Sequence, residues 1–142
     1  MRSHRFGAVL LLFALTPLLL AGCSPSSAAD AEAEKKDTFC TEVPALLGDI
    51  TDDLQGVTAT PEQAPKLLTE AVDRISAVEP PADVTPQWQR LVTAWTSMRD
   101  LLARADLTDP AANADLAPQM SSLQTELVDS GTAVDDYGKA NC

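Results

Sequence analysis

The side chains best suited to chemistry in this chain are three cysteines and a set of paired carboxylates. The only histidine is His4, which stands ahead of a long apolar run. If the first 22 residues are removed, as argued below, no imidazole remains to act as general base, proton shuttle or metal ligand. Catalytic triads, Cys–His pairs and histidine-containing zinc sites are then excluded. The sequence also lacks a glycine-rich phosphate loop and an Asp-rich calcium loop of the required spacing.

Carboxylates are the catalytic groups that remain, with Asp52-Asp53 and Asp135-Asp136 as pairs and Asp129 near the second pair. Such pairs can bind a divalent cation or act as acid and base. They also fall between the apolar positions of the expected helices, where acidic side chains on a solvated face keep a protein soluble. We favour the second interpretation and predict no catalytic residue, no metal site and no cofactor, hence no enzyme.

Cys23 follows a segment with the three-part layout of a secretory signal. Two arginines lie near the start, residues 6–20 are apolar, and Ala21-Gly22 come directly before the cysteine. The apolar run covers 15 residues, fewer than the ~20 that span a bilayer. This length argues against an uncleaved transmembrane helix.

This arrangement resembles the lipobox of bacterial lipoproteins. The resemblance implies that residues 1–22 are a lipoprotein signal peptide, cut before Cys23, whose sulfur carries a diacylglyceryl group, with palmitate as a typical acyl chain. Two acyl chains give a stable anchor, whereas one gives only marginal binding. The expected location is the outer face of the cell membrane. The alternative is an ordinary secretory signal that leaves Cys23 as a thiol.

The charge of the remaining chain limits its partners. Loss of Arg2 and Arg5 leaves eight basic residues against 21 acidic ones, a formal net charge of −13. Nucleic acid is not an expected partner, because binding it needs clustered Lys and Arg. Anionic lipid headgroups would repel the chain, so the lipid anchor must hold it at the membrane. An envelope protein with a basic surface is the expected partner.

The mature chain divides into a short tether and one domain. Residues 23–36 have no apolar periodicity and are predicted to be a flexible tether. Residues 37–142 are enough for one small domain. Their apolar residues recur at spacings of three and four, which predicts helices throughout.

Four helices are predicted in this domain. Pro44 is tolerated only in a first turn, so the first helix begins near Thr41 or kinks at the proline. Thr60 and Thr85 each precede a proline and are predicted to cap the second and third helices. The apolar stripes run over Phe39–Val57, Ala64–Val78, Trp88–Leu102 and Met120–Tyr137, with one short turn starting at Asp109-Pro110.

Single apolar stripes must face one another to leave water, and short connections favour antiparallel neighbours. The predicted fold is therefore all-α, an antiparallel up-down-up-down four-helix bundle. Its first helix begins, and its last helix ends, at the same end of the bundle. Cys40 and Cys142 occupy these places and are an even pair in an oxidising compartment. We predict a disulfide between them; the alternatives are two free thiols, or Cys142 paired with another molecule.

Several short motifs resemble small secreted or lipid-anchored helical proteins of actinobacteria. They are Phe39-Cys40 before a helical stripe, the stop at Glu79-Pro80-Pro81-Ala82-Asp83, a tryptophan shortly after it, and the terminal Asn141-Cys142. The resemblance covers nearly the whole mature domain. It implies a helical fold with a cysteine bridge between the ends of the domain, and no known activity.

Trp88 and Trp95 are seven residues apart on the third helix, as are Gly131 and Gly138 on the fourth. In an antiparallel pair each indole would lie over a glycine, where the missing Cβ leaves room for the ring. Core packing is one interpretation of this pattern.

The other interpretation is a slot for a flat apolar ligand, lined by Trp88 and Trp95 and extended by Met98 and Met120. Methionines at stripe positions are more often core filler. Three function classes follow: a non-enzymatic binding or interaction module of the cell envelope, a carrier of a small apolar or haem-like ligand between the helices, and an enzyme that uses carboxylates alone. The lack of catalytic groups favours the first class.

Replacement of Cys23 by serine should release the protein from membranes or block its processing, because the anchor is attached to the sulfur. Membrane fractionation and intact mass spectrometry test this. A Cys23→Ser variant that fractionates like the unchanged protein, or an unmodified Cys23 in the mature chain, would contradict the lipid anchor.

Overall fold

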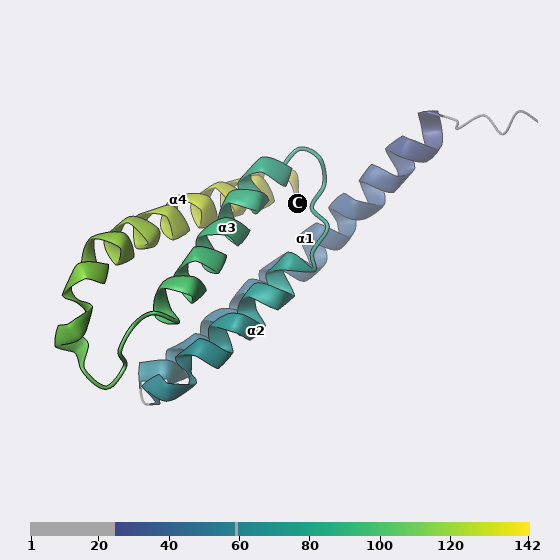
Figure 1. Ribbon diagram of the computed structural model, residues 1–142. Coiled ribbons are helices and arrows are strands. Elements are labelled where there is room, and N and C mark those ends of the chain that lie inside the picture. Colours follow the sequence, from purple (N-terminus) through teal and green to yellow (C-terminus); the bar gives the residue numbers. More distant parts are fainter. Residues whose placement is uncertain (1–24, 59) are drawn as a thin grey trace, which may run out of the picture.

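The computed structural model describes residues 25–58 and 60–142, and the secondary structure of these residues is helical (Figure 1). The predicted signal peptide and Cys23 lie outside this range. Short 3₁₀ helices connect α1 to α2 and α3 to α4, and a turn connects α2 to α3. The α-helices are α1 Pro25–Gln55, α2 Ala64–Ser76, α3 Thr85–Leu102 and α4 Ala117–Asn141; the 3₁₀ helices are η1 Gly56–Thr58, η2 Pro61–Gln63 and η3 Pro110–Leu116.

Each α-helix packs against the next one along the chain, which confirms the predicted all-α four-helix fold. The contact is most extensive between α3 and α4, smaller between α2 and α3, and smallest between α1 and α2. The first turns of α1 project past the other helices (Figure 1). The bundle is therefore tight on the α3–α4 side and looser around α1.

The predicted disulfide joins Cys40 of α1 to Cys142, directly after α4, with their Cα atoms 5.5 Å apart. Beside it, Phe39 lies between two other aromatic rings. Its ring centroid is 5.3 Å from that of Trp88 on α3 and 5.9 Å from that of Tyr137 on α4, both edge to face. Edge-to-face pairs add about 0.5–1.5 kcal/mol beyond the burial of their area. This aromatic cluster joins three helices.

Aliphatic side chains continue the core on either side of the aromatic cluster. Among the described residues, Ser130 is the buried polar one, and its hydroxyl donates to the carbonyl of Glu126, 2.5 Å away. The hydrogen bond satisfies the hydroxyl within its own helix. The aliphatic core residues are Val43, Ile50, Ala71, Ile75, Val84, Leu91 and Val134.

The prediction of a flexible tether over residues 23–36 is wrong from Pro25 onward, because α1 begins there. This segment lacks an apolar stripe, but residues 28–36 consist of Ala, Glu, Lys and one Asp, mostly strong helix formers. Extending a helix that has already nucleated needs only one fixed residue per added hydrogen bond. The backbone N–H of Ala82 also donates to Glu32 Oε2 at 3.0 Å, which ties this part of α1 to the turn after α2.

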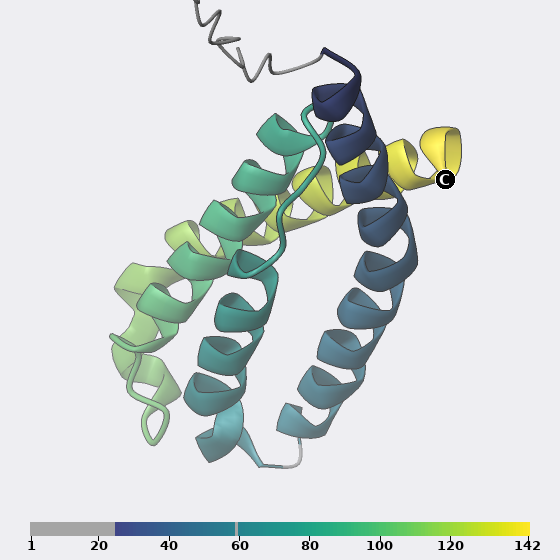
Figure 2. The ribbon, with the colours of Figure 1, turned by 90° about the vertical axis from the view of Figure 1, so that its right-hand side faces the viewer.

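Of the two alternatives predicted at Pro44, a helix start near Thr41 is wrong, since α1 runs without interruption through the proline. Pro44 lacks the N–H that would bond the carbonyl of Cys40, a loss that with its ring clash costs about 3 kcal/mol in a helix interior. Figure 2 shows α1 as one bowed helix. The residues on both sides of the proline are held by packing, because Phe39 and Val43 are buried before it and Ile50 after it.

The two threonines do not cap their helices as predicted. The Thr60 side chain makes no capping bond to η2, and the hydroxyl of Thr85 donates to the carbonyl of Pro81 at 2.9 Å. Pro65 lies in the first turn of α2, and η2 directly precedes this helix. The turn predicted at Asp109-Pro110 is η3, and Asp109 Oδ1 accepts from the N–H of Ala111 at 3.1 Å.

The expected pairing of the tryptophans with the glycines of α4 is contradicted. A Cβ built on Gly131 or Gly138 would meet no atom within 4 Å, so no indole lies over either residue. Tyr137 and Val134 are the buried residues of this part of α4. Since neighbouring residues point about 100° apart around a helix, burying Tyr137 turns Gly138 away from α3.

Removal of the disulfide should lower the free energy of unfolding by about 2–4 kcal/mol, because the bridge closes a long loop in the unfolded chain. Its two cysteines are separated by 102 positions. Chemical denaturation of a Cys40→Ala/Cys142→Ala variant measures the loss. Reductant should destabilise the unchanged protein and leave the variant unaffected, and equal stability of the two proteins would contradict the prediction.

Candidate functional site

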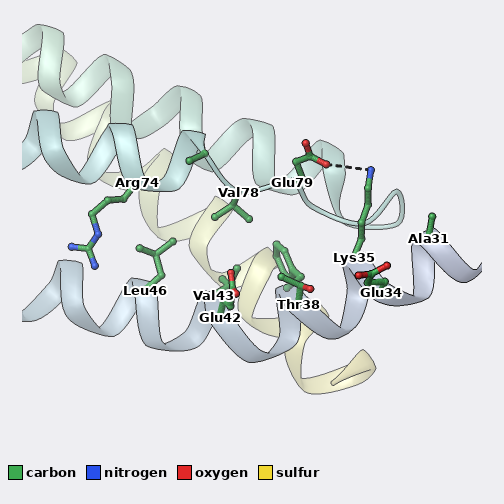
Figure 3. A pocket seen from close by; sticks show the side chains of 12 residues that line it. Ala31, Glu34, Lys35, Thr38, Glu42, Val43, Leu46, Arg74, Val78 and Glu79 are labelled. Carbon is green, nitrogen blue, oxygen red and sulfur yellow. Dashed lines mark ion pairs between the residues drawn. The ribbon is translucent and has the colours of Figure 1, made fainter.

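A groove of about 780 Å³ lies open between α1 and the C-terminal end of α2 (Figure 3). We call it the α1–α2 groove. Its floor is apolar and includes the buried residues Phe39 and Val43. One edge is formed by polar side chains on successive turns of α1. The lining residues are Ala31, Glu34, Lys35, Thr38, Phe39, Glu42, Val43, Leu46, Arg74, Ala77, Val78 and Glu79.

An ion pair bridges α1 and the α2 side near each end of the groove. At one end Lys35 Nζ is 3.7 Å from Glu79 Oε2, across the turn that follows α2 (Figure 3). At the other end the guanidinium of Arg74 lies 3.4 Å from Asp49 Oδ2 and 3.2 Å from Asp53 Oδ2. These pairs are partly exposed, where each contributes about 1 kcal/mol or less. Each pair connects the two walls of the groove.

Glu34 and Glu42 stand on the free edge of the groove, and both are exposed. Within the described part of the chain neither carboxylate has a bonding partner. Both cations of the groove already pair with carboxylates. Counting the groove and its ion pairs together, six carboxylates face two cations: Glu32, Glu34, Glu42, Asp49, Asp53 and Glu79 against Lys35 and Arg74.

A second, smaller cavity adjoins the α1–α2 groove and shares Lys35, Val78 and Glu79 with it. It measures about 560 Å³ and reaches across to α3, where Trp88 lines it. The Lys35–Glu79 ion pair therefore lies between the two hollows.

A third cavity of about 360 Å³ lies between α1 and α4, next to the disulfide, and we call it the α1–α4 slot. Gly131 and Gly138 line it, and both are partly exposed. The ion pair between Lys139 and Asp135 stands on its lining as well. Its other walls are Phe39, Cys40, Val43, Pro44, Leu47, Val134 and Cys142.

The four residues predicted to form a ligand slot do not come together in any of these three cavities. Trp88 is only 2% exposed and belongs to the core. Trp95 is partly buried against the same core, and Met98 and Met120 are partly exposed. Trp88 lines the cavity of about 560 Å³, whereas Trp95, Met98 and Met120 line none of these cavities.

The acidic pairs predicted to be solvated lie on exposed faces. Asp53 pairs with Arg74, and Asp135 pairs with Lys139. Within residues 25–58 and 60–142, no group of three or more His, Cys, Asp or Glu side chains is arranged to hold a metal ion. In the same residues, no helix is both long and apolar enough to cross a membrane.

Tyr137, whose ring contacts Phe39, lies in an unusual electrostatic environment. Its phenol is buried, and its oxygen has no hydrogen-bond partner in the described structure. Burial raises the pKa of Tyr137, and the nearby carboxylates of Asp83 and Glu32 raise it further. The indole N–H of Trp88 is likewise buried and unpartnered. The aromatic cluster therefore holds two polar atoms that folding has removed from water.

Sequence reasoning missed the groove because its α1 wall lies partly in the segment predicted to be a tether. Lys35 lies in that segment, yet it bridges to Glu79. A signal was available in the alternation of Ala with Glu and Lys over residues 28–36, which favours helix. The pairing of that helix with residue 79 has no local signal.

Comparison of the chain with models of protein families, with curated protein sequences and with solved structures gave no match.

Replacement of Tyr137 by phenylalanine should leave the free energy of unfolding unchanged or raise it by about 1 kcal/mol, because it removes a buried hydroxyl without a partner. The unchanged protein should lose stability as the pH rises above about 10, the ordinary pKa of tyrosine. There the unfolded chain releases the phenolic proton while the folded state retains it. This loss continues until the pH passes the raised pKa of the folded state, and the variant should lack it.

Urea denaturation at neutral and alkaline pH measures both effects. A large destabilisation of the Tyr137→Phe variant at neutral pH would show that the hydroxyl has a bonding partner after all.

Proposed function

We propose that this chain is a lipid-anchored, extracytoplasmic binding module of the cell envelope that works without catalysis. The observation that carries the proposal is the α1–α2 groove, which combines an apolar floor with an acidic edge whose carboxylates Glu34 and Glu42 are unpartnered. Binding sites are typically concave and apolar, with a few polar groups that fix orientation. The arrangement suits a partner with apolar and basic side chains.

The signal layout before Cys23 supports the anchor and the location outside the cytoplasm. An anchor confines the protein to one surface and raises its effective concentration beside other envelope proteins. The formal charge of −13 after cleavage favours partners with a basic surface, since opposite charge speeds encounter. Neither the anchor nor the charge requires a reaction at the site.

The α1–α4 slot supports a second candidate function, that of a carrier for a small apolar molecule. Its volume of about 360 Å³ falls in the range of small-molecule pockets. Met98 and Met120 are not among its lining residues, so these methionines offer no ligand to a haem iron there. The slot therefore favours an apolar molecule over haem.

Site-specific photo-crosslinking in intact cells tests the binding module. A photoreactive amino acid in place of Thr38, which lines the groove, should crosslink reproducibly to one envelope protein. The same amino acid in place of Thr125, which is exposed on α4, is the matched control and should not. Association should weaken as salt is raised, because the attraction is electrostatic.

Other outcomes would overturn the proposal. Equal crosslinking from both positions would mean that the groove has no special role. A stoichiometric adduct of a small molecule in native mass spectrometry would favour the carrier. A hydrolytic activity that disappears on replacing Asp52-Asp53 or Asp135-Asp136 would identify an enzyme.

A further inference from the structure

We infer that the α1–α2 groove binds an amphipathic helix of a partner protein that carries Lys or Arg beside its apolar face. This inference rests on the proposed function and specifies the chemistry of its partner. Three properties of the groove support it: its length, the helical hydrogen bonding of its backbone, and the distribution of its charges.

The length of the groove matches several turns of helix. Its lining on α1 extends from Ala31 to Leu46, which at 1.5 Å per residue is about 22 Å. A partner helix of about 16 residues would cover this distance. The floor includes Phe39. Val43 and Leu46 of α1 and Val78 opposite them also line it (Figure 3). These side chains offer apolar contacts to the apolar face of a helix.

The backbone of the groove favours a helix over an extended segment. The α1 wall and the part of the opposite wall that belongs to α2 are helical, so most of their N–H and C=O groups are used within these helices. The remaining lining residues, Ala77, Val78 and Glu79, lie in the turn after α2 and form no strand. An extended peptide over this apolar floor would find no sheet edge with which to pair, and buried backbone groups without partners are costly. A helix satisfies its own backbone and presents only side chains to the groove.

The charges determine which helix fits. Glu34 and Glu42 are eight residues apart on one edge of α1, or about 12 Å along its axis, and both carboxylates are unpartnered in the described structure. Basic residues two turns apart on the partner would lie opposite them, with their aliphatic stems on the apolar floor. A second copy of this chain is disfavoured as the occupant, since two chains of formal charge −13 repel one another.

A pair of synthetic peptides of about 16 residues tests the inference. Both carry leucine along one helical face; one has lysines beside this face, and the other has glutamates. The lysine peptide should bind the purified full chain in saturable 1:1 fashion, measured by fluorescence anisotropy and calorimetry. Binding should weaken strongly between about 50 and about 300 mM salt, and the glutamate peptide should not bind.

Two charge-reversal variants locate the site. Glu34→Lys/Glu42→Lys should weaken binding of the lysine peptide about tenfold or more. Asp115→Lys/Asp129→Lys is the matched control, because it changes the net charge equally at exposed positions outside the groove. The control should bind within about twofold of the unchanged protein, and circular dichroism checks that both variants are folded.

Equal weakening in both variants would overturn the inference, since the peptide would then respond only to net charge. Failure of the lysine peptide to bind would also overturn it. If crosslinking from Thr38 still identifies an envelope protein, the proposed function stands and only the helical partner is wrong. If that crosslink is absent as well, both fail.

Discussion

The rest of the structure depends on one joint between α1 and α4. This joint consists of the disulfide between Cys40 and Cys142 and of the Phe39 ring, which lies between Trp88 and Tyr137. Elsewhere α1 makes much less contact with its neighbours than α3 makes with α4. A covalent bond and one aromatic cluster therefore hold the 31-residue helix α1 against α3 and α4. Because the joint lies partway along α1, the helix is held at that point and leaves hollows on both sides.

Those hollows are the α1–α2 groove and the α1–α4 slot, and Phe39 and Val43 line both. Bundle helices usually close such spaces with large apolar side chains. On the α4 side the wall carries Gly131 and Gly138, whose missing side chains leave the slot open. On the α2 side the ion pairs of Lys35 and Arg74 bridge the walls near the ends, and polar residues form the edge. The two hollows beside α1 therefore follow from the glycines of α4 and from the polar residues between α1 and α2.

Under the proposed function, the early start of α1 also places the groove near the membrane. The helix begins at Pro25, two positions after Cys23, and the groove begins at Ala31. A helical connection of this length extends only about 10 Å. Anionic headgroups would repel the acidic groove, which leaves the groove accessible to the partner's basic side chains.

Much of the fold could be predicted from local sequence. Apolar stripes such as residues 64–78 and 88–102 must be buried away from water. Their spacing alone therefore predicts helices that pack together. Cys40 and Cys142 could be paired because an even number of antiparallel helices returns the chain to its starting end. The prolines of the loops predicted where the helices break. These inferences succeed because the hydrophobic effect and the steric limits of proline act over a few neighbouring residues.

Three features depended on contacts that are distant in sequence. Residues 25–36 are helical because α1 extends backward and Glu32 bonds to Ala82, whereas an apolar stripe is missing. Pro44 lies inside α1 because packing before and after it outweighs its local penalty. Gly138 faces the slot because Tyr137 took the buried position on α4. The sequence by itself determined the helices, their order and the covalent joint. The groove and the slot were decided only by the packing of α1 against α2 and α4. The shape of a space between helices depends on their rotation and separation, which no local pattern encodes.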